Sequence, residues 1–179
     1  FKVVELQPDG FEAHYFRARS CVVQGRYEDA VRHYEVAAKL APEDYQIPIL
    51  AGQVYHALGR DEEGMAANRR GRELAERRIC VNPEDVRAYY MGAGAMVRLG
   101  QVDRGVEWAE RALAIDPTDP AILYNVSCTF AAAGRVDQAI DCLERSVRGG
   151  SSYKDWIEND SDLDPLRDHP RFWALLARL

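Results

Sequence analysis

Two residue patterns in the 179-residue chain begin like catalytic or cofactor-binding motifs. Gly92-Ala93-Gly94 starts a dinucleotide-binding fingerprint, but the third glycine is missing and no strand is expected before it. Ser151 and Lys154 have the serine–lysine spacing of penicillin-binding enzymes, but the companion SDN and KTG motifs are absent. We therefore attribute the glycines to helix packing and predict no enzyme activity from either pattern.

A third pattern concerns metal binding. Asp160, Asp162 and Asp164 have the first three ligand spacings of a calcium loop. Pro165 stands where that loop needs glycine, and Arg171 stands where it needs the closing glutamate, so we interpret the aspartates as helix caps. The histidines and cysteines show neither HExxH nor CxxC spacing, and no Ser/His/Asp set is indicated. We expect no metal, no cofactor and no catalytic residues.

The composition describes a soluble globular protein. The chain is 47% apolar with a formal net charge of −6, which gives no electrostatic reason to expect nucleic acid as a partner. The longest stretches without charge have 15 residues (45–59 and 120–134), too short for a membrane helix of about 20 residues. The four scattered cysteines fit reduced thiols, so we expect a cytoplasmic protein without a membrane partner. The start at Phe1 suggests a piece of a longer protein.

The elements that must position any binding residues follow from a repeat. Four prolines lie 34, 41 and 34 residues apart, and each is followed 17 residues later by a glycine (Pro8, Pro42, Pro83, Pro117; Gly25, Gly59, Gly100, Gly134). Each half-period accommodates one helix, which glycine ends with a positive φ or proline ends by refusing to continue it. We predict an all-α fold with helices near 11–24, 27–40, 45–58, 61–80, 86–99, 102–115, 120–133 and 136–148.

This period and its small residues resemble the tetratricopeptide repeat family. In the repeat that begins at Phe11, the family's small and aromatic positions hold Ala18, Ala30, Tyr34 and Ala37. The repeats from Val86 and Pro120 match similarly, whereas the repeat from Tyr45 has Gly64 and Asn68 in place of alanine and an aromatic residue. The resemblance implies a right-handed superhelix of helix-turn-helix repeats with a C-terminal helical cap.

We expect three parts along the chain. Residues 1–8 are the remnant of a preceding repeat, residues 9–152 hold four repeats, and residues 153–179 form the cap, in which Asp164-Pro165 and Asp168-His169-Pro170 are interpreted as acidic N-caps followed by proline. The excess of seven residues before Pro83 is close to two helical turns, so the apolar face can continue. We therefore predict one continuous long helix from Asp61 to Cys80, with Gly64 and Gly71 in close contact with a neighbouring helix.

A narrower resemblance concerns the last repeats. The segments Tyr124–Cys128 and Trp156–Arg167 are similar to the closing repeats of large bacterial signalling proteins, in which the repeats follow a serine/threonine kinase, a cyclase or a winged-helix domain, often beside a TolB-like segment. None of those domains is present in this sequence. The resemblance implies the setting of a module and not the activity of a parent protein.

The family resemblance also implies where partners bind. The first helix of each repeat lines a concave groove, which here offers Tyr15, Arg19, Gln53, His56, Arg87, Tyr90, Tyr124 and Asn125. These tyrosines either contact a ligand or mainly stack helix on helix. We predict a non-catalytic scaffold that binds a protein, a peptide or other domains of its parent chain. The family's carboxylate clamp for chaperone tails is matched by Arg87 alone, so such tails are not the expected ligand.

Two further surfaces are open to interpretation. A basic patch on the long second helix (Arg69, Arg70, Arg72, Arg77, Arg78) is either a solvated face or a secondary docking site for an acidic segment, with RNA as a third possibility. The alternative function is self-association, in which the Phe1–Leu6 edge or this long helix pairs with a second copy to form a homo-oligomer. An enzyme is the remaining class.

Overall fold

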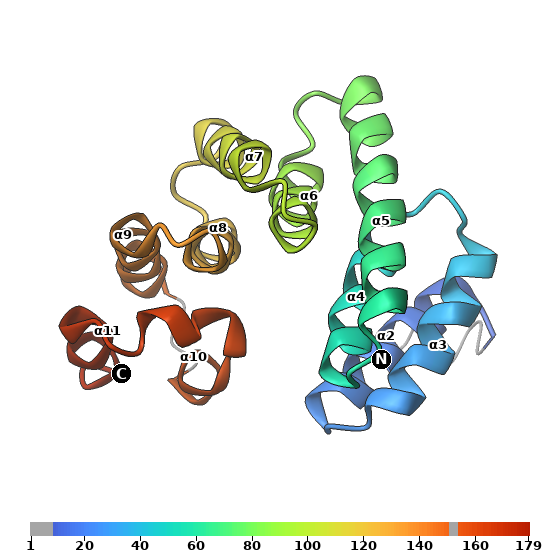
Figure 1. Ribbon diagram of the computed structural model, residues 1–179, viewed down its shortest axis with the longest axis horizontal. Coiled ribbons are helices and arrows are strands. Elements are labelled where there is room, and N and C mark those ends of the chain that lie inside the picture. Colours follow the sequence, from blue (N-terminus) through green and yellow to red (C-terminus); the bar gives the residue numbers. More distant parts are fainter. Residues whose placement is uncertain (1–8, 151–153) are drawn as a thin grey trace. The chain divides into compact units, whose positions relative to one another are not determined.

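The computed structural model describes residues 9–150 and 154–179, and within these ranges the chain is helical with no β-strand (Figure 1). This confirms the predicted all-α helical-repeat fold. The expected remnant helix at Phe1–Gln7 lies outside the described residues. The repeat helices are α2 (Phe11–Val23), α3 (Tyr27–Leu40), α4 (Gln46–Ala57), α5 (Asp61–Val81), α6 (Val86–Arg98), α7 (Val102–Ile115), α8 (Pro120–Ala132) and α9 (Val136–Arg148).

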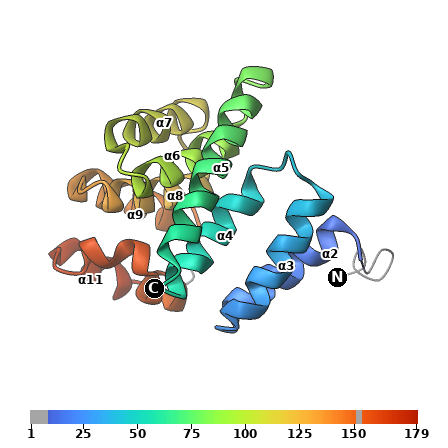
Figure 2. The same ribbon diagram turned by 45° about the vertical axis from the view of Figure 1, so that its right-hand side comes forward.

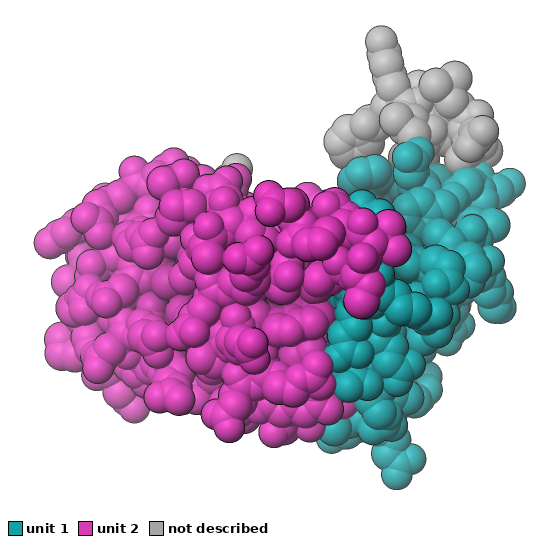
Figure 3. Space-filling view, turned by 90° about the horizontal axis from the view of Figure 1, so that it is seen from above, with its two compact units in different colours: residues 1–78 teal, residues 79–179 magenta. Residues whose placement is uncertain are grey.

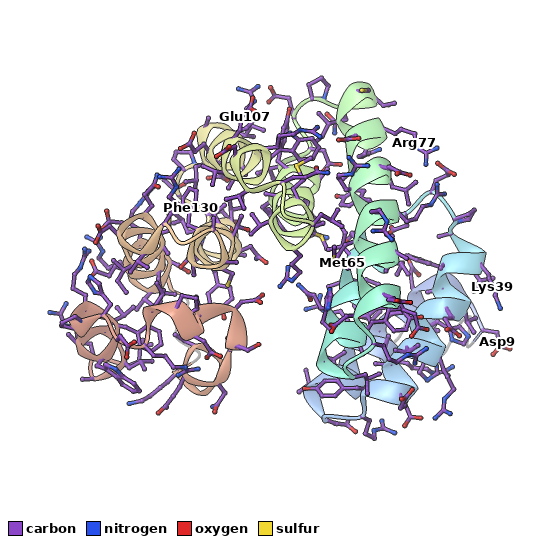
Figure 4. All side chains as sticks on the ribbon, in the orientation of Figure 1. Asp9, Lys39, Met65, Arg77, Glu107 and Phe130 are labelled. Atoms are coloured by element: carbon purple, nitrogen blue, oxygen red, sulfur yellow. The ribbon has the colours of Figure 1, made fainter. Side chains whose placement is uncertain are left out.

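The chain falls into two compact units, residues 1–78 and residues 79–179 (Figure 3). In the first unit α3 packs between α2 and α4 (Figure 2), around a core that includes Tyr34, Ile47 and Val54. In the second unit α6 packs against α7 and α8, and α8 packs against α9. Phe130, which Figure 4 labels, lies fully inside that second core. The predicted division into remnant, repeats and cap stays a prediction.

The repeat glycines end the first helices as predicted. Gly25, Gly59, Gly100 and Gly134 have φ between +70° and +76°, the left-handed region that disfavours residues with a side chain. The residue after each glycine turns its amide back onto the helix, as when Arg26 N donates to Cys21 O at 2.9 Å and Gln101 N donates to Met96 O at 2.9 Å. This is the Schellman pattern, which satisfies carbonyls that the helix end would leave unpaired.

Two of the closing prolines are held by arginines from the following repeat. Arg70 Nη2 on α5 donates to the carbonyl of Pro42 at 3.1 Å, and Arg145 Nη2 on α9 donates to the carbonyl of Pro117 at 2.5 Å. Both pairs are 28 residues apart, so the same repeat position supplies the same bond in each unit. A cationic donor on a carbonyl makes a stronger hydrogen bond than a neutral one. The linkers between repeats are therefore fixed by side chains as well as by proline.

The second helix of repeat two is one unbroken helix of 21 residues, compared with 14 in α3 and α7. This confirms the prediction from the seven-residue excess. Its glycines let α4 approach closely: a Cβ on Gly71 would lie 2.3 Å from Ile49 Cγ1, and one on Gly64 would lie 2.8 Å from His56 Nε2. The departure of repeat two from the family pattern thus has a packing cause. An alanine at position 64 would overlap the His56 imidazole.

The C-terminal part consists of α10 (Lys154–Asn159), a 3-10 helix η1 (Ser161–Leu166) and α11 (Pro170–Leu176). Leu163, Leu166 and Phe172 are fully buried and join the core of α8 and α9. On α11, the guanidinium of Arg171 binds Asp141 at 2.7 Å and Glu144 at 2.8 Å, both on α9. The apolar face of the last repeat is therefore covered by chain that follows it.

The capping residues of this part agree with the expectation only at Asp160, one of the three aspartates interpreted as caps. Asp160, not Asp164, caps η1, with its Oδ1 accepting from Asp162 N at 2.9 Å, and Pro165 lies inside η1. Pro170 does open α11, but the cap is the His169 ring, whose Nδ1 accepts from Arg171 N at 3.3 Å. The Asp168 cap is therefore wrong. Sequence shows which residue types can cap a helix, whereas the helix start decides which of them does.

Candidate functional site

The predicted groove residues divide between the two units. Tyr15 and Arg19 lie on α2 and Gln53 and His56 lie on α4, all in the first unit. The second unit holds the others, with Arg87 and Tyr90 on α6 and Tyr124 and Asn125 on α8. Gln53, Arg87 and Asn125 are exposed, while Tyr90 is half-buried against the core of its unit. Each unit therefore presents its own set of candidate binding residues.

An aromatic and cationic cluster stands on α2. Tyr15 stacks on Phe11 with ring centroids 6.0 Å apart and meets Phe16 edge-on at 5.3 Å. Arg19 lies over the Tyr15 ring at 5.9 Å and donates to its hydroxyl at 3.4 Å. Phe16 and Val23 are 53% and 73% exposed, unusually high for large apolar side chains. The structure thus brings Tyr15 and Arg19 together, and it adds Phe16 and Val23, which the sequence analysis did not select.

His56 has a structural role on α4. Its Nδ1 lies 2.8 Å from Asp61 Oδ1, and its Nε2 lies 3.4 Å from the amide nitrogen of the fully buried Asn68. Both ring nitrogens therefore face side chains of α5. In the tautomer that fits, Nδ1 donates to the carboxylate and Nε2 accepts from the amide. A Cβ on Gly52 would lie 2.9 Å from Asn68 Oδ1, so the lack of a side chain at Gly52 permits the close approach of Asn68 to α4.

In the second unit, the predicted groove residue Tyr124 contacts the chain's own tail. Tyr124 donates its hydroxyl proton to Asp160 Oδ2, and Arg98 Nη2 lies 2.7 Å and 2.8 Å from the two oxygens of Asp162. Arg98 also passes close to Gly94, where an added Cβ would lie 3.4 Å from Nη1, an ordinary van der Waals contact. The Tyr124 hydroxyl is consequently engaged within the chain. The sequence analysis did not predict this contact. It singled out Asp160 and Asp162 for their spacing, but not as partners of Tyr124 and Arg98.

The electrostatics of this contact keep a nearby thiol unreactive. Burial raises the pKa of the Cys128 thiol well above its usual value, and the Asp160 and Asp162 carboxylates raise it further. The thiolate is the nucleophilic form of cysteine, so a raised pKa means little reactive thiolate at neutral pH. We therefore expect Cys128 to be mostly in the thiol form at neutral pH.

The patterns that suggested a metal or a cofactor have other uses. Asp160 and Asp162 hold the tail on Tyr124 and Arg98, while Asp164 pairs with Arg167 Nε at 2.7 Å. Gly92-Ala93-Gly94 lies inside α6, not in a loop that could cradle a phosphate. Within residues 9–150 and 154–179, no three His, Cys, Asp or Glu side chains are placed to hold a metal ion. In the same part of the chain, no helix is long and apolar enough to cross a membrane.

The basic patch on α5 is partly used within its unit. Glu43 lies 3.6 Å from both Arg70 and Arg77. Arg72 is largely buried, with its side chain 18% exposed between Glu73 and Glu76, so it does not project into solvent as we expected. Arg69 and Arg78 are exposed. Because three of the five arginines face carboxylates of their own unit, the patch offers less positive charge to a partner than its sequence suggests.

Comparisons with known proteins address the fold. Residues 11–44 and 56–120, together more than half of the chain, match models of the tetratricopeptide repeat. A thermophilic TPR protein from Thermus thermophilus has a similar structure, with a TM-score of 0.64 and 19% identity over 98% of this chain and 86% of that chain. YrrB, a TPR protein with an unusual peptide-binding site, gives a TM-score of 0.46 and 20% identity over 85% of this chain and 75% of that chain.

The structure of MamA gives a TM-score of 0.46 and 17% identity over 83% of this chain and 82% of that chain. No curated protein matches the sequence. At 19% identity the Thermus thermophilus structure shows the fold alone, whereas the family models match the sequence itself. The paired helices and the glycine turns of the structure agree with the tetratricopeptide repeat that the family models match. The chain belongs to the tetratricopeptide repeat family.

Proposed function

We propose that the chain is a non-catalytic scaffold that binds a protein segment on the first-helix faces of its repeats, as a module of a larger bacterial signalling protein in the cytoplasm. Tetratricopeptide repeats form protein–protein interaction scaffolds, and the partner class proposed here is a peptide segment or another domain of the parent chain. The observation that carries the proposal is the exposed aromatic and arginine cluster on α2. Phe16 is 53% exposed there, and Arg19 is exposed with its guanidinium on the Tyr15 hydroxyl.

The second unit supports the same proposal on α6. Arg87 is exposed at the start of α6, and Tyr90 is half-buried one turn later. A tyrosine of this kind presents rigid area at low cost in side-chain entropy, and arginine adds directed donors. Binding energy at interfaces usually concentrates in a few Tyr, Trp and Arg residues. We propose Arg87 and Tyr90 as the anchors of this unit, because both lie on α6, the first helix of its repeat.

The proposal predicts a loss of binding without a loss of structure. Arg87→Ala and Tyr90→Ala should each weaken the binding of peptides selected from a random-sequence display library by more than about 1 kcal/mol, roughly fivefold. Fluorescence anisotropy measures the affinity, and circular dichroism checks that helicity is unchanged. Lys39→Ala on α3 and Glu107→Ala on α7 are matched controls on exposed second-helix positions (Figure 4). Unchanged affinity in both first-helix variants would remove α6 as a binding surface.

A further inference from the structure

The second unit contains an internal example of what its groove residues bind. The tail presents Asp160 to the Tyr124 hydroxyl and Asp162 to the Arg98 guanidinium, and the next residue, Leu163, is fully buried. The ligand is therefore a segment with two carboxylates separated by one residue and followed by a leucine. Tyrosine and arginine at first-helix positions are the groups that receive it. Its chemistry is a charge-assisted contact beside an apolar anchor.

A tyrosine and an arginine also stand on α2, where within the described residues no carboxylate contacts them. Arg19 is exposed and pairs with no carboxylate in the part of the chain that the structure describes; its contact is the Tyr15 hydroxyl. Phe16 and Val23 supply exposed apolar surface on the same helix. Counted from the start of each repeat, they correspond to Asn125 and Ala132 of α8, which are also exposed. These repeat positions are therefore not the ones that pack helix on helix.

Resting on the proposed function, we propose that the face of α2 formed by Tyr15, Phe16, Arg19 and Val23 binds a partner segment of the Asp-x-Asp-Leu type. The carboxylates bind Arg19 and Tyr15, which stand one turn apart on α2, with the same chemistry by which Asp162 and Asp160 bind Arg98 of α6 and Tyr124 of α8. The leucine covers Phe16 or Val23. Glu12 is exposed near the start of α2 and repels acidic groups there. The acidic part of the segment is thus directed toward the C-terminal end of α2.

The tail itself supplies the probe. A fluorescent peptide with the sequence of residues 157–167 (Ile-Glu-Asn-Asp-Ser-Asp-Leu-Asp-Pro-Leu-Arg) is titrated into the protein and followed by anisotropy. We expect saturable binding that Arg19→Ala weakens at least fivefold and that Lys39→Ala leaves unchanged. A peptide with asparagine at the positions of Asp160 and Asp162 should bind weakly to the unchanged protein. The affinity of this asparagine peptide should fall little further in the Arg19→Ala protein, because the change in the peptide and the change in the protein remove the same contact.

A second variant separates this site from exchange of the tail. If the peptide displaced the bound tail of the second unit, Arg98→Ala and not Arg19→Ala would change its affinity. That outcome overturns the assignment to α2, as does the absence of saturable binding. Failure here is distinguishable from failure of the proposed function. If the tail peptide does not bind α2 but library peptides still bind through Arg87 and Tyr90, this ligand assignment is wrong and the proposed scaffold function stands.

Discussion

Replacing Leu163 by alanine should lower the free energy of unfolding of the second unit by about 2–5 kcal/mol, the range for deleting a fully buried leucine side chain. Leu163 is completely buried in the core that the tail shares with α8 and α9. The cavity would weaken the whole η1 segment, and with it the contacts of Asp160 and Asp162 with Tyr124 and Arg98. Urea unfolding followed by circular dichroism measures the change in free energy.

A matched substitution separates burial from a general intolerance of alanine. Leu40 at the end of α3 is 49% exposed, so Leu40→Ala removes the same atoms from a half-solvated place. We expect a change of less than about 1 kcal/mol there, because surface substitutions away from special contacts have small effects. If Leu163→Ala were as mild as Leu40→Ala, the tail would not be part of the core. The contacts of the tail with Tyr124 and Arg98 would then lose their physical basis.

Gly71→Ala should destabilise the first unit by about 1–3 kcal/mol, the usual cost of overpacking. The added Cβ would lie 2.3 Å from Ile49 Cγ1 and 3.1 Å from the backbone nitrogen of Ile49, so α4 and α5 would have to separate. Alanine normally stabilises a helix interior by about 1 kcal/mol relative to glycine, so a net loss means that the steric contact outweighs the helix propensity.

Gly94→Ala is the control for this prediction, because it is also a glycine inside a helix. A Cβ at Gly94 would meet only the flexible end of Arg98 at 3.4 Å and Thr129 Oγ1 at 3.7 Å. We expect that variant to be stabilised by up to about 1 kcal/mol. Thermal unfolding compares the two. A stabilising Gly71→Ala would show that α4 and α5 do not approach as closely as the structure places them.

The helices could be predicted from sequence because glycine and proline recur at the helix ends of each repeat. The ranges predicted for 27–40, 102–115 and 136–148 match α3, α7 and α9. The range for α4 differs by one residue at each end, and the other repeat helices differ by one residue at one end. Glycine and proline act locally, so each boundary needs only a few neighbouring residues. The long α5 was predictable for the same reason, since seven residues add two turns without rotating the buried face far.

The candidate site was less predictable because its contacts join residues far apart in the chain. Arg98 and Asp162 are 64 residues apart, and no periodic pattern links the tail to α6. The family resemblance placed Tyr124 among the groove residues, but it could not show that Asp160 reaches its hydroxyl. His56 was similarly selected by position, whereas its partners Asp61 and Asn68 lie on the helix that departs from the family pattern. Exposure of Phe16 and Val23 also follows only from the packed structure.

The central claim, that partners bind on first-helix faces, is tested most directly by site-specific photo-crosslinking. The photoreactive residue p-benzoylphenylalanine replaces Gln53 on α4 or Arg87 on α6, and in parallel Lys39 on α3 or Glu107 on α7, all four of which are exposed. Each protein is irradiated with peptides selected from the display library, and crosslinked product is counted by mass spectrometry. We predict crosslinks from a first-helix position and none from positions 39 and 107. Crosslinks confined to positions 39 and 107 would contradict the account.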